Sequence, residues 1–501
     1  MSAVTSAHPR GGFVTLAAAV AVATAVTAVG ALPAVATVGQ PGTVDTTFNT
    51  PLLSGGVGSI AVQQDGKLII VGNFENLGPN HIGYVARLNS DGSLDTSFVP
   101  PIFGFNGVPR TAAVLPSGDI VVAGGFTDYR VGVGPLQIAN KILKLSSTGA
   151  VKPFPAPSFG PFGIGEINTL AIDPINYYPS PPRIMVGGTF ASVGGDGSYR
   201  AFASLIEGGS LDATPKIGFT GGSDSVRAIV TRPSGYLVGG QFQSPYGGID
   251  HGITRTILDG SHDNTFVPPN IDGSVESIDV ASNGKILVGG AFSNVGSSTG
   301  DNLVRLNPNG SYDPTFVPPA FDAAPKSVKF LPDGKVIAAG WFTSVGGDAT
   351  RNSIVRLNAD GSRDTTFNPP TFTGSASPWA TSVALTAGDK IVVAGFFENL
   401  GGDPARDRLA RLDGGELAAK VPTAQSVTTV AKLRVGKRKK LPAVTQQGVP
   451  VAWKSLTKSR CVIKSGKLVA VRRGTCKVRA TAAGTVDYLA LSQILKVKIV
   501  N

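Results

Sequence analysis

A glycine followed two positions later by phenylalanine, at the end of an apolar run, recurs seven times along the chain. The copies are Gly72/Phe74, Gly124/Phe126, Gly188/Phe190, Gly240/Phe242, Gly290/Phe292, Gly340/Phe342 and Gly395/Phe397. A repeat of about 50 residues predicts a series of equivalent supersecondary units rather than one irregular core. The 501 residues therefore divide first into these units and then into whatever lies outside them.

Turn residues inside each unit predict its strands. Asp65-Gly66-Lys67 lies between two apolar runs, and Asp-Gly in that position is a strong hairpin signal. A third apolar run and a second Asp-Gly-Ser turn follow, and then a pattern such as Leu94 to Phe98 that ends in Asp-x-x-Phe. Four antiparallel strands in a unit of this length predict a β-propeller blade.

The two ends of the repeat array complement each other. The seventh unit reaches Leu412 but lacks its Asp-x-x-Phe strand, whereas Val44 to Phe48 matches that strand ahead of the first unit. Closing the array would remove exposed sheet edges. We therefore predict an all-β fold, a seven-bladed propeller over residues 44–419 that is closed by its N-terminal strand.

From Val44 to Lys420 the repeats resemble the delta-60 repeat β-propellers of bacterial surface and secreted proteins, on units such as Leu331 to Val336 and Val355 to Ser362. The resemblance implies an architecture and no activity. Three places depart from it: Lys144 replaces the usual arginine, Val151 to Phe154 distorts a fourth strand, and Ile175 to Pro182 is an insertion.

The N-terminus has the pattern of a secretory signal peptide. An apolar stretch from Phe13 to Ala31 precedes Ala34-Val35-Ala36, a small-x-small cleavage pattern. We predict a signal peptide at residues 1–36, a short linker at 37–43 and an extracellular, secreted or cell-surface protein. The alternative is an uncleaved anchor helix. No later segment is apolar for long enough to span a membrane.

Residues 420–501 form a different, strongly basic module. After Val421 the chain carries 17 Lys and Arg residues against one acidic residue, Asp487. Short runs separated by Gly and Pro predict a small β-sandwich, and the segment from Cys461 to Gly484 resembles a bacterial Ig-like domain. We expect Cys461 and Cys476 to form a disulfide in an exported protein. With no histidine nearby they make no zinc site.

Four consecutive cations, Lys437, Arg438, Lys439 and Lys440, are the candidate anion-binding residues of this module. In an exported protein the partner would be an anionic cell-envelope polymer. No aromatic residues interleave with the cluster, which argues against a nucleic-acid site. The alternative is a solvated basic face with no single partner.

The remaining polar residues give little sign of catalysis. The Asp and Arg residues that recur in several units, such as Asp95 and Arg87, are expected to be structural because catalytic groups should break the repeat. No motif predicts a catalytic, cofactor-binding or metal site. Tyr177, Tyr178 and Trp341 do break the repeat and are the candidate ligand-binding residues, since exposed aromatics on loops stack against sugars or peptides.

These features predict a non-catalytic extracellular protein that binds a glycan or another protein. A second reading is a propeller-type carbohydrate-active enzyme, which would need convergent carboxylates such as Glu166, Asp173 and Glu276 near the centre of the propeller. A third is a purely structural surface or adhesin component.

Overall fold

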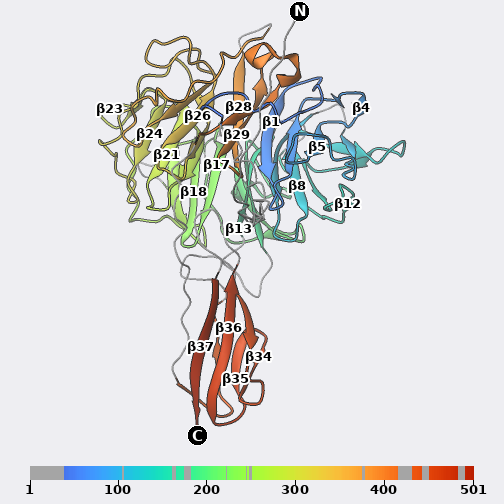
Figure 1. The fold of residues 1–501 in the computed structure, drawn as a ribbon, viewed down its shortest axis with the longest axis vertical. Helices are drawn as coiled ribbons and strands as arrows, with labels where there is room; N and C mark the ends of the chain where they lie inside the picture. Colours follow the sequence, from blue (N-terminus) through green and yellow to red (C-terminus); the bar gives the residue numbers. More distant parts are fainter. Residues whose placement is uncertain are drawn as a thin grey trace, which may run out of the picture. The chain divides into compact units, whose positions relative to one another are not determined.

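The computed structural model describes residues 39–103, 107–160, 165–173, 182–219, 221, 223–243, 245–246, 251–374, 378–415, 432–442, 451–482 and 491–501. The predicted signal peptide and the two tyrosines of the insertion, Tyr177 and Tyr178, lie outside this part of the chain. The regular secondary structure of the described residues is β-strand (Figure 1), apart from the short 3₁₀ helices η1 (Gly197–Tyr199), η2 (Leu400–Gly402) and η3 (Pro404–Arg406). Among them, no helix has the length and apolar character needed to cross a membrane.

Each Gly-x-Phe unit forms one antiparallel sheet in the described residues, and the glycine ends or nearly ends its second strand. In chain order, the sheets are β1 (Val57–Val62), β2 (Leu68–Gly72), β5 (Val85–Leu88); β7 (Pro109–Val114), β8 (Ile120–Gly124), β11 (Ile142–Leu145), β12 (Val151–Lys152); β13 (Ile167–Asp173), β14 (Arg183–Gly188), β15 (Phe202–Ile206), β16 (Leu211–Asp212); β17 (Ser225–Arg232), β18 (Gly235–Gln241), β19 (Ile253–Ile257); β20 (Ser274–Val280), β21 (Ile286–Ala291), β24 (Leu303–Leu306); β25 (Pro325–Phe330), β26 (Val336–Gly340), β27 (Ile354–Leu357); and β28 (Trp379–Thr386), β29 (Lys390–Phe396), β30 (Leu409–Asp413).

Additional short strands lie in the loops that connect the strands of these sheets. They are β3 (Asn76–Leu77) with β4 (Asn80–His81), β22 (Asn294–Val295) with β23 (Ser298–Thr299), and β6 (Ile102–Phe103) with β9 (Asp128–Arg130) and β10 (Gln137–Ile138).

The fourth strand of most units is shorter than predicted. It is reduced to one bridge in four of them: Leu88 to Leu94, Thr256 to His262, Leu306 to Tyr312 and Leu357 to Arg363. The reason is local. The Asp95 carboxylate accepts hydrogen bonds from the backbone nitrogen and the hydroxyl of Ser97, and Phe98 N donates to the Asp95 carbonyl. These bonds turn the chain out of the ladder.

The atypical second unit keeps a regular fourth strand, contrary to the predicted distortion. Val151 pairs with Leu145 and Lys152 with Lys144. Lys144, which replaces the usual arginine, still reaches the next sheet because its Nζ donates to the Glu207 carbonyl oxygen over 3.2 Å. Pro153 has no donor for a further pair, so β12 ends there.

The phenylalanines that mark the repeat form the apolar core between neighbouring sheets. Phe74, Phe126, Phe190, Phe342 and Phe397 are fully buried. Several pack edge to face against a second ring, as Phe342 does with Phe321 at a centroid distance of 5.0 Å. Burying one such side chain contributes about 2 kcal/mol. The phenylalanine of the Gly-x-Phe signature therefore recurs because it fills the apolar core between neighbouring sheets.

A repeated polar contact links each of several sheets to the next. Arg305 Nε donates to Asp313 Oδ2 over 2.7 Å, Arg305 Nη1 donates to the Ala359 carbonyl of the following sheet, and the guanidinium lies 4.7 Å from the Phe316 ring centroid. Arg87, Arg255, Arg356 and Arg411 make the same three kinds of contact. We call this the Arg–Asp–Phe contact. It confirms that the recurring Asp and Arg residues are structural partners.

The first and last sheets of the array also lie side by side (Figure 1). Thr381 Oγ1, in β28, donates to the Val57 carbonyl oxygen of β1 over 2.6 Å. Val44 bridges Leu412 in antiparallel orientation. Phe48 belongs to an apolar cluster that contains Val57 together with Val392, Ala394 and Leu409 from the last sheet.

The C-terminal module contains two sheets. One has the order β31 (Lys432–Arg434), β37 (Leu491–Val500), β36 (Gly474–Ala482), β33 (Ala452–Ser455), and the other has the order β32 (Arg438–Lys440), β35 (Lys467–Ala470), β34 (Cys461–Lys464). Cys461 and Cys476 form the predicted disulfide, which joins the two sheets, with Cα atoms 5.7 Å apart. Their side chains pack in an apolar cluster with Leu468, Val478 and Val497.

Candidate functional site

The first strand of every repeat sheet contributes to one cavity of about 710 Å³. Its walls also include residues just after the second strands, among them Asn73, Thr189 and Trp341. We call it the bulge cavity, for the reason that follows.

Each first strand contains a β-bulge at the same place. The register against the second strand skips one residue in all seven sheets, and the skipped residues are Gly58, Arg110, Asn168, Arg227, Glu276, Lys326 and Thr381. All seven line the bulge cavity. A bulge bends a strand and changes the direction of its side chain. The repeat therefore supplies one backbone feature seven times, and six residue types occupy it, with arginine present twice.

The repeat glycine makes room for this bulge. A Cβ atom added to Gly340 would lie 2.3 Å from the Ala324 carbonyl oxygen, and one added to Gly290 would lie 2.1 Å from the Ser274 carbonyl oxygen. The glycines of the other five copies would meet a backbone oxygen of the first strand, or of the residue just before it, at 1.9 to 2.3 Å. These distances leave no room for a side chain at the position of the repeat glycine. The bulge that lines the cavity therefore also explains why this position is glycine in every copy.

The charged bulge residues form a network inside the cavity. Glu276 accepts from Arg227 Nη1 through Oε1 over 2.7 Å and pairs with Lys326 Nζ through Oε2 over 3.0 Å. Ser274 Oγ also donates to Glu276 Oε1. On another side of the cavity, Arg110 Nη2 lies 2.7 Å from Glu166 Oε2, and these two side chains are about half exposed. The cavity thus offers more cations than carboxylates.

Aromatic rings stand beside these charges. Trp341 is 50% exposed, and Lys326 Nζ lies 3.7 Å from its ring centroid. Burial lowers the pKa of Lys326, against the opposing effect of the Glu276 carboxylate. Trp379 packs edge to face with Trp341, and its ring lies 4.9 Å from that of Phe396. Flat apolar faces next to fixed charges suit a ligand with both rings and polar groups.

The same geometry is less suited to acid–base chemistry. Both oxygens of Glu276 are occupied by Arg227, Lys326 and Ser274. A glycosidase needs one carboxyl group that donates a proton to the substrate and a second that acts from the other face. Within the described residues, no group of three or more His, Cys, Asp or Glu side chains is placed to hold a metal ion.

Of the candidates from sequence, Trp341, Glu166 and Glu276 come together in the bulge cavity. Asp173 does not line it. Its Oδ2 accepts a hydrogen bond from the Tyr236 hydroxyl over 3.0 Å, in the contact between two neighbouring sheets. Burial, together with the Asp173 charge, raises the pKa of Tyr236. Tyr177 and Tyr178 lie outside the described residues.

The cations of the C-terminal module lie at its surface. Lys437, Arg438, Lys439 and Lys440 are all exposed, and the last three form the edge strand β32. None of the four has an acidic partner among the described residues. Exposure alone does not test binding, so the anion-binding role of these four residues stays a prediction.

Sequence reasoning missed Arg110, Arg227, Lys326 and Trp379. A signal was present, because the bulge residue lies 14 positions before the repeat glycine in five copies, as Lys326 does before Gly340. Aligning the units on their glycines would have isolated one column of dissimilar residues. That this column faces a common cavity depends on how the sheets are arranged in space.

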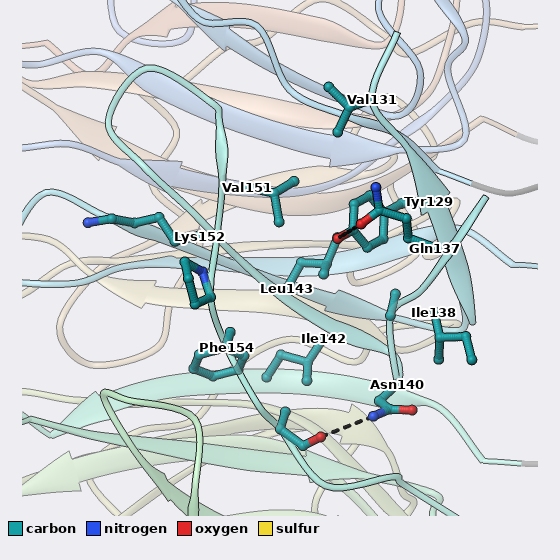
Figure 2. A pocket seen from close by; sticks show the side chains of 13 residues that line it. Tyr129, Val131, Gln137, Ile138, Asn140, Ile142, Leu143, Val151, Lys152 and Phe154 are labelled. Carbon is teal, nitrogen blue, oxygen red and sulfur yellow. Dashed lines mark hydrogen bonds between the residues drawn. The ribbon is translucent and has the colours of Figure 1, made fainter. Parts of the chain in front are cut away.

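A second cavity, of about 410 Å³, lies beside β9, β10, β11 and β12 (Figure 2). Its polar side chains already have protein partners. The Tyr129 hydroxyl donates to Gln137 Oε1 over 2.8 Å, and Asn140 Nδ2 donates to the Ala156 carbonyl oxygen over 3.0 Å. It offers a ligand few directional groups, so the bulge cavity is the stronger candidate site.

Comparison with known proteins supports the architecture. The family model described as a domain of unknown function (DUF5122) β-propeller matches residues 63–98, 281–316 and 331–367. Each match ends at the phenylalanine of the Asp-x-x-Phe pattern, namely Phe98, Phe316 and Phe367. No curated protein matches the chain.

Several solved structures are similar to this chain at low sequence identity. Virginiamycin B lyase from Staphylococcus aureus is 14% identical, with 73% of this chain and 97% of that chain covered and a TM-score of 0.47. The WD40 β-propeller domain of Doa1 is 12% identical, with 75% and 97% covered and a TM-score of 0.45. The WD40 domain of Pan2 from Neurospora crassa is 10% identical, with 74% and 98% covered and a TM-score of 0.40. The match of three of its repeats to the family model supports a β-propeller fold for the repeat array.

Proposed function

We propose that the chain is a non-catalytic extracellular binding protein whose bulge cavity holds a glycan or a peptide segment of another protein. The observation that carries this proposal is the set of seven bulge residues, in which an unvarying backbone presents dissimilar side chains to one cavity. Structural residues of a repeat recur from unit to unit, as the arginines of the Arg–Asp–Phe contact do. Residues that differ at equivalent positions are free to serve recognition.

The composition of the cavity favours these ligands. Trp341 presents an exposed ring on which a sugar or an aromatic side chain can stack. The half-exposed pair of Arg110 and Glu166 can exchange its mutual contact for hydrogen bonds to ligand hydroxyls or amides.

A carbohydrate-active enzyme is the second candidate, because two of the carboxylates considered for it, Glu166 and Glu276, line the same cavity. The full set of cationic and hydroxyl partners around Glu276 weighs against it. Release of reducing sugar from a bound glycan, lost in Glu166→Gln, would establish the enzyme instead.

The binding role rests on a wider architectural proposal. We propose that the seven sheets close into a seven-bladed propeller, with residues 44–48 as the last strand of the last blade, and that residues 420–501 form an Ig-like domain. The bridge from Val44 to Leu412 and the packing of Phe48 support closure. The disulfide supports export, since such bonds persist in oxidising compartments. The basic module would then hold the protein on an anionic cell-envelope polymer.

Glycan and peptide arrays probed with the full chain test the binding role. We expect Trp341→Ala to weaken binding of any hit by about 10-fold or more, as loss of an aromatic anchor does. Val99→Ala, at a residue that is 71% exposed and lines none of the cavities described above, is the matched control and should bind like the parent chain.

A double variant, Tyr177→Ala with Tyr178→Ala, separates the cavity from the insertion. If this variant loses binding and Trp341→Ala does not, the ligand binds at the insertion and the bulge cavity is not the site. Equal thermal melting of all variants would show that each change acts on binding rather than on folding.

A further inference from the structure

The outer face of the four-stranded sheet in the C-terminal module carries seven cations. They are Lys432, Arg434, Lys454, Lys477, Arg479, Lys496 and Lys498, and all are exposed. Residues that pair directly across neighbouring strands share a face of the sheet. The register pairs Lys432 with Lys498, Lys477 with Lys496, and Lys454 with Arg479, so these cations lie in adjacent rows.

This arrangement has a cost in stability. Like charges directly opposite each other destabilise a sheet, by about 0.2 to 1 kcal/mol for each pair. No salt bridge relieves them among the described residues, and the only acidic residue after Val421, Asp487, lies outside that part of the chain. The inner face of the same strands is apolar and packed around Cys476, Val478 and Val497. Within this sheet the repulsion is thus confined to the exposed face.

We propose that this face binds a linear phosphodiester polymer along the rows of cations. This inference rests on the proposed function, in which the basic module attaches the protein to an anionic polymer. It adds which surface of the module binds the polymer and which chemical class the polymer belongs to. Same-face side chains repeat about every 7 Å along a strand and about 5 Å between strands, which suits a chain with one charge per repeat unit.

The choice of phosphodiester follows from the side chains. Five of the seven cations are lysines, which bind phosphate as point charges, and only two are arginines, whose planar fork binds carboxylate and phosphate alike. The described neutral positions on the face include Ala452, Thr475, Thr481 and Ile494, with no ring among them. Trp453 faces the core side, where its Nε1 donates to the Pro442 carbonyl oxygen. Without aromatic platforms the face is poorly suited to nucleic-acid bases or sugar rings.

The second sheet of the module supplies a matched control. Arg438, Lys440, Lys464 and Lys467 are exposed residues of β32, β34 and β35. Lys467 pairs with Lys440 and with Lys464, and Arg438 pairs with Val469. They include two members of the cluster predicted from sequence. Neutralising four cations on either sheet removes the same charge, so a difference between the two variants reports position rather than net charge.

The test measures binding of the full chain to poly(glycerol phosphate) over a range of salt concentrations. The variant with Lys477→Gln, Arg479→Gln, Lys496→Gln and Lys498→Gln should lose about 10-fold or more in affinity and show a shallower salt dependence, because fewer counterions are released. The variant with Arg438→Gln, Lys440→Gln, Lys464→Gln and Lys467→Gln should lose less than about 3-fold.

Each other outcome overturns a stated part of the argument. Equal losses in the two variants mean that binding follows net charge, which rejects the surface but leaves the proposed attachment intact. Equal affinity of the parent chain for alginate, a polycarboxylate, rejects the phosphodiester chemistry. Single-stranded DNA is itself a phosphodiester polymer, so tighter binding to it than to poly(glycerol phosphate) would show that bases are recognised and would reject a face that binds phosphate charge alone. If the parent chain binds none of these polymers, the attachment role itself is rejected.

Discussion

Arg411 Nε lies 2.8 Å from Asp45 Oδ2, although the two residues are 366 positions apart in the chain. The same guanidinium donates through Nη1 to the Ser90 carbonyl oxygen and lies 4.7 Å from the centroid of the Phe48 ring. These are the three parts of the Arg–Asp–Phe contact. A contact that elsewhere joins consecutive sheets therefore also joins the last sheet to the N-terminal segment and to the first repeat.

The first prediction concerns this seam. Arg411→Ala should lower the free energy of unfolding by about 2 kcal/mol, because the buried Asp45 carboxylate loses its guanidinium partner and keeps the Lys390 ammonium, 3.1 Å away. The control is Arg255→Ala, which removes the corresponding contact between consecutive sheets. Urea unfolding should give similar losses for the two variants.

Deleting residues 44–48 should destabilise the propeller far more than deleting 421–501, and equal melting of the two truncations would refute closure.

The second prediction concerns acid stability. Burial alone would raise the pKa of Asp313, but hydrogen bonds from Lys285, Thr315 and Arg305 outweigh it and hold the pKa well below the ordinary value of 3.8. A lowered folded-state pKa means that the stabilisation is complete above about pH 4 and is lost as the pH falls further. Asp313→Asn should thus cost much more stability at pH 7 than at pH 2.5. Parallel denaturant curves at both pH values measure the difference, and an equal cost at both would contradict the assignment.

The third prediction concerns the repeat glycine. In Gly340→Ala the new methyl group would collide with the Ala324 carbonyl, so the bulge that presents Lys326 must shift. We expect a loss of about 1 to 3 kcal/mol, as for other overpacked sites. Gly208→Ala meets nothing closer than 3.8 Å and should be nearly neutral. Thermal unfolding of both variants compares them, and a neutral Gly340→Ala would show that the bulge does not need this glycine.

The fourth prediction concerns the disulfide. Replacing Cys461 and Cys476 by serine should destabilise the C-terminal module by about 3 kcal/mol, because the bridge closes a loop with a sequence separation of 15. Calorimetry of the full chain with and without reductant provides the measurement. If the reduced chain and the double variant melt as the oxidised parent does, the bridge is not a stabilising element.

Much of the fold could be predicted from local sequence. Hairpin turns such as Asp333-Gly334-Lys335, the apolar runs and the Phe residues of the repeat mark the strands correctly because each signal acts over a few residues. The fourth strand was overpredicted since the Asp-x-x-Phe pattern also forms a turn. The side-chain hydrogen bonds of Asp95 decide between the two, and a strand pattern does not show them.

The candidate site was only partly predictable. Trp341 was found because it breaks the repeat. Lys326 was missed because a single lysine in a first strand resembles any exposed charge. Its proximity to Glu276, about 50 positions away, follows from two sheets that are adjacent in space. Its proximity to Trp341, about 15 positions away, follows from the pairing of β25 with β26 within one sheet.

The sequence by itself determined the number of repeats, the hairpins within them, the pairing of the two cysteines and the basic character of the C-terminal module, because each depends on residue type and short-range spacing. Only the tertiary structure decided that the residue 14 positions before a repeat glycine, such as Lys326 before Gly340, is displaced by a bulge into a shared cavity. It also decided that Arg411 meets Asp45 across the whole length of the array. Both relationships arise from packing sheets against one another, and packing brings together residues whose separation in the chain carries no local signal.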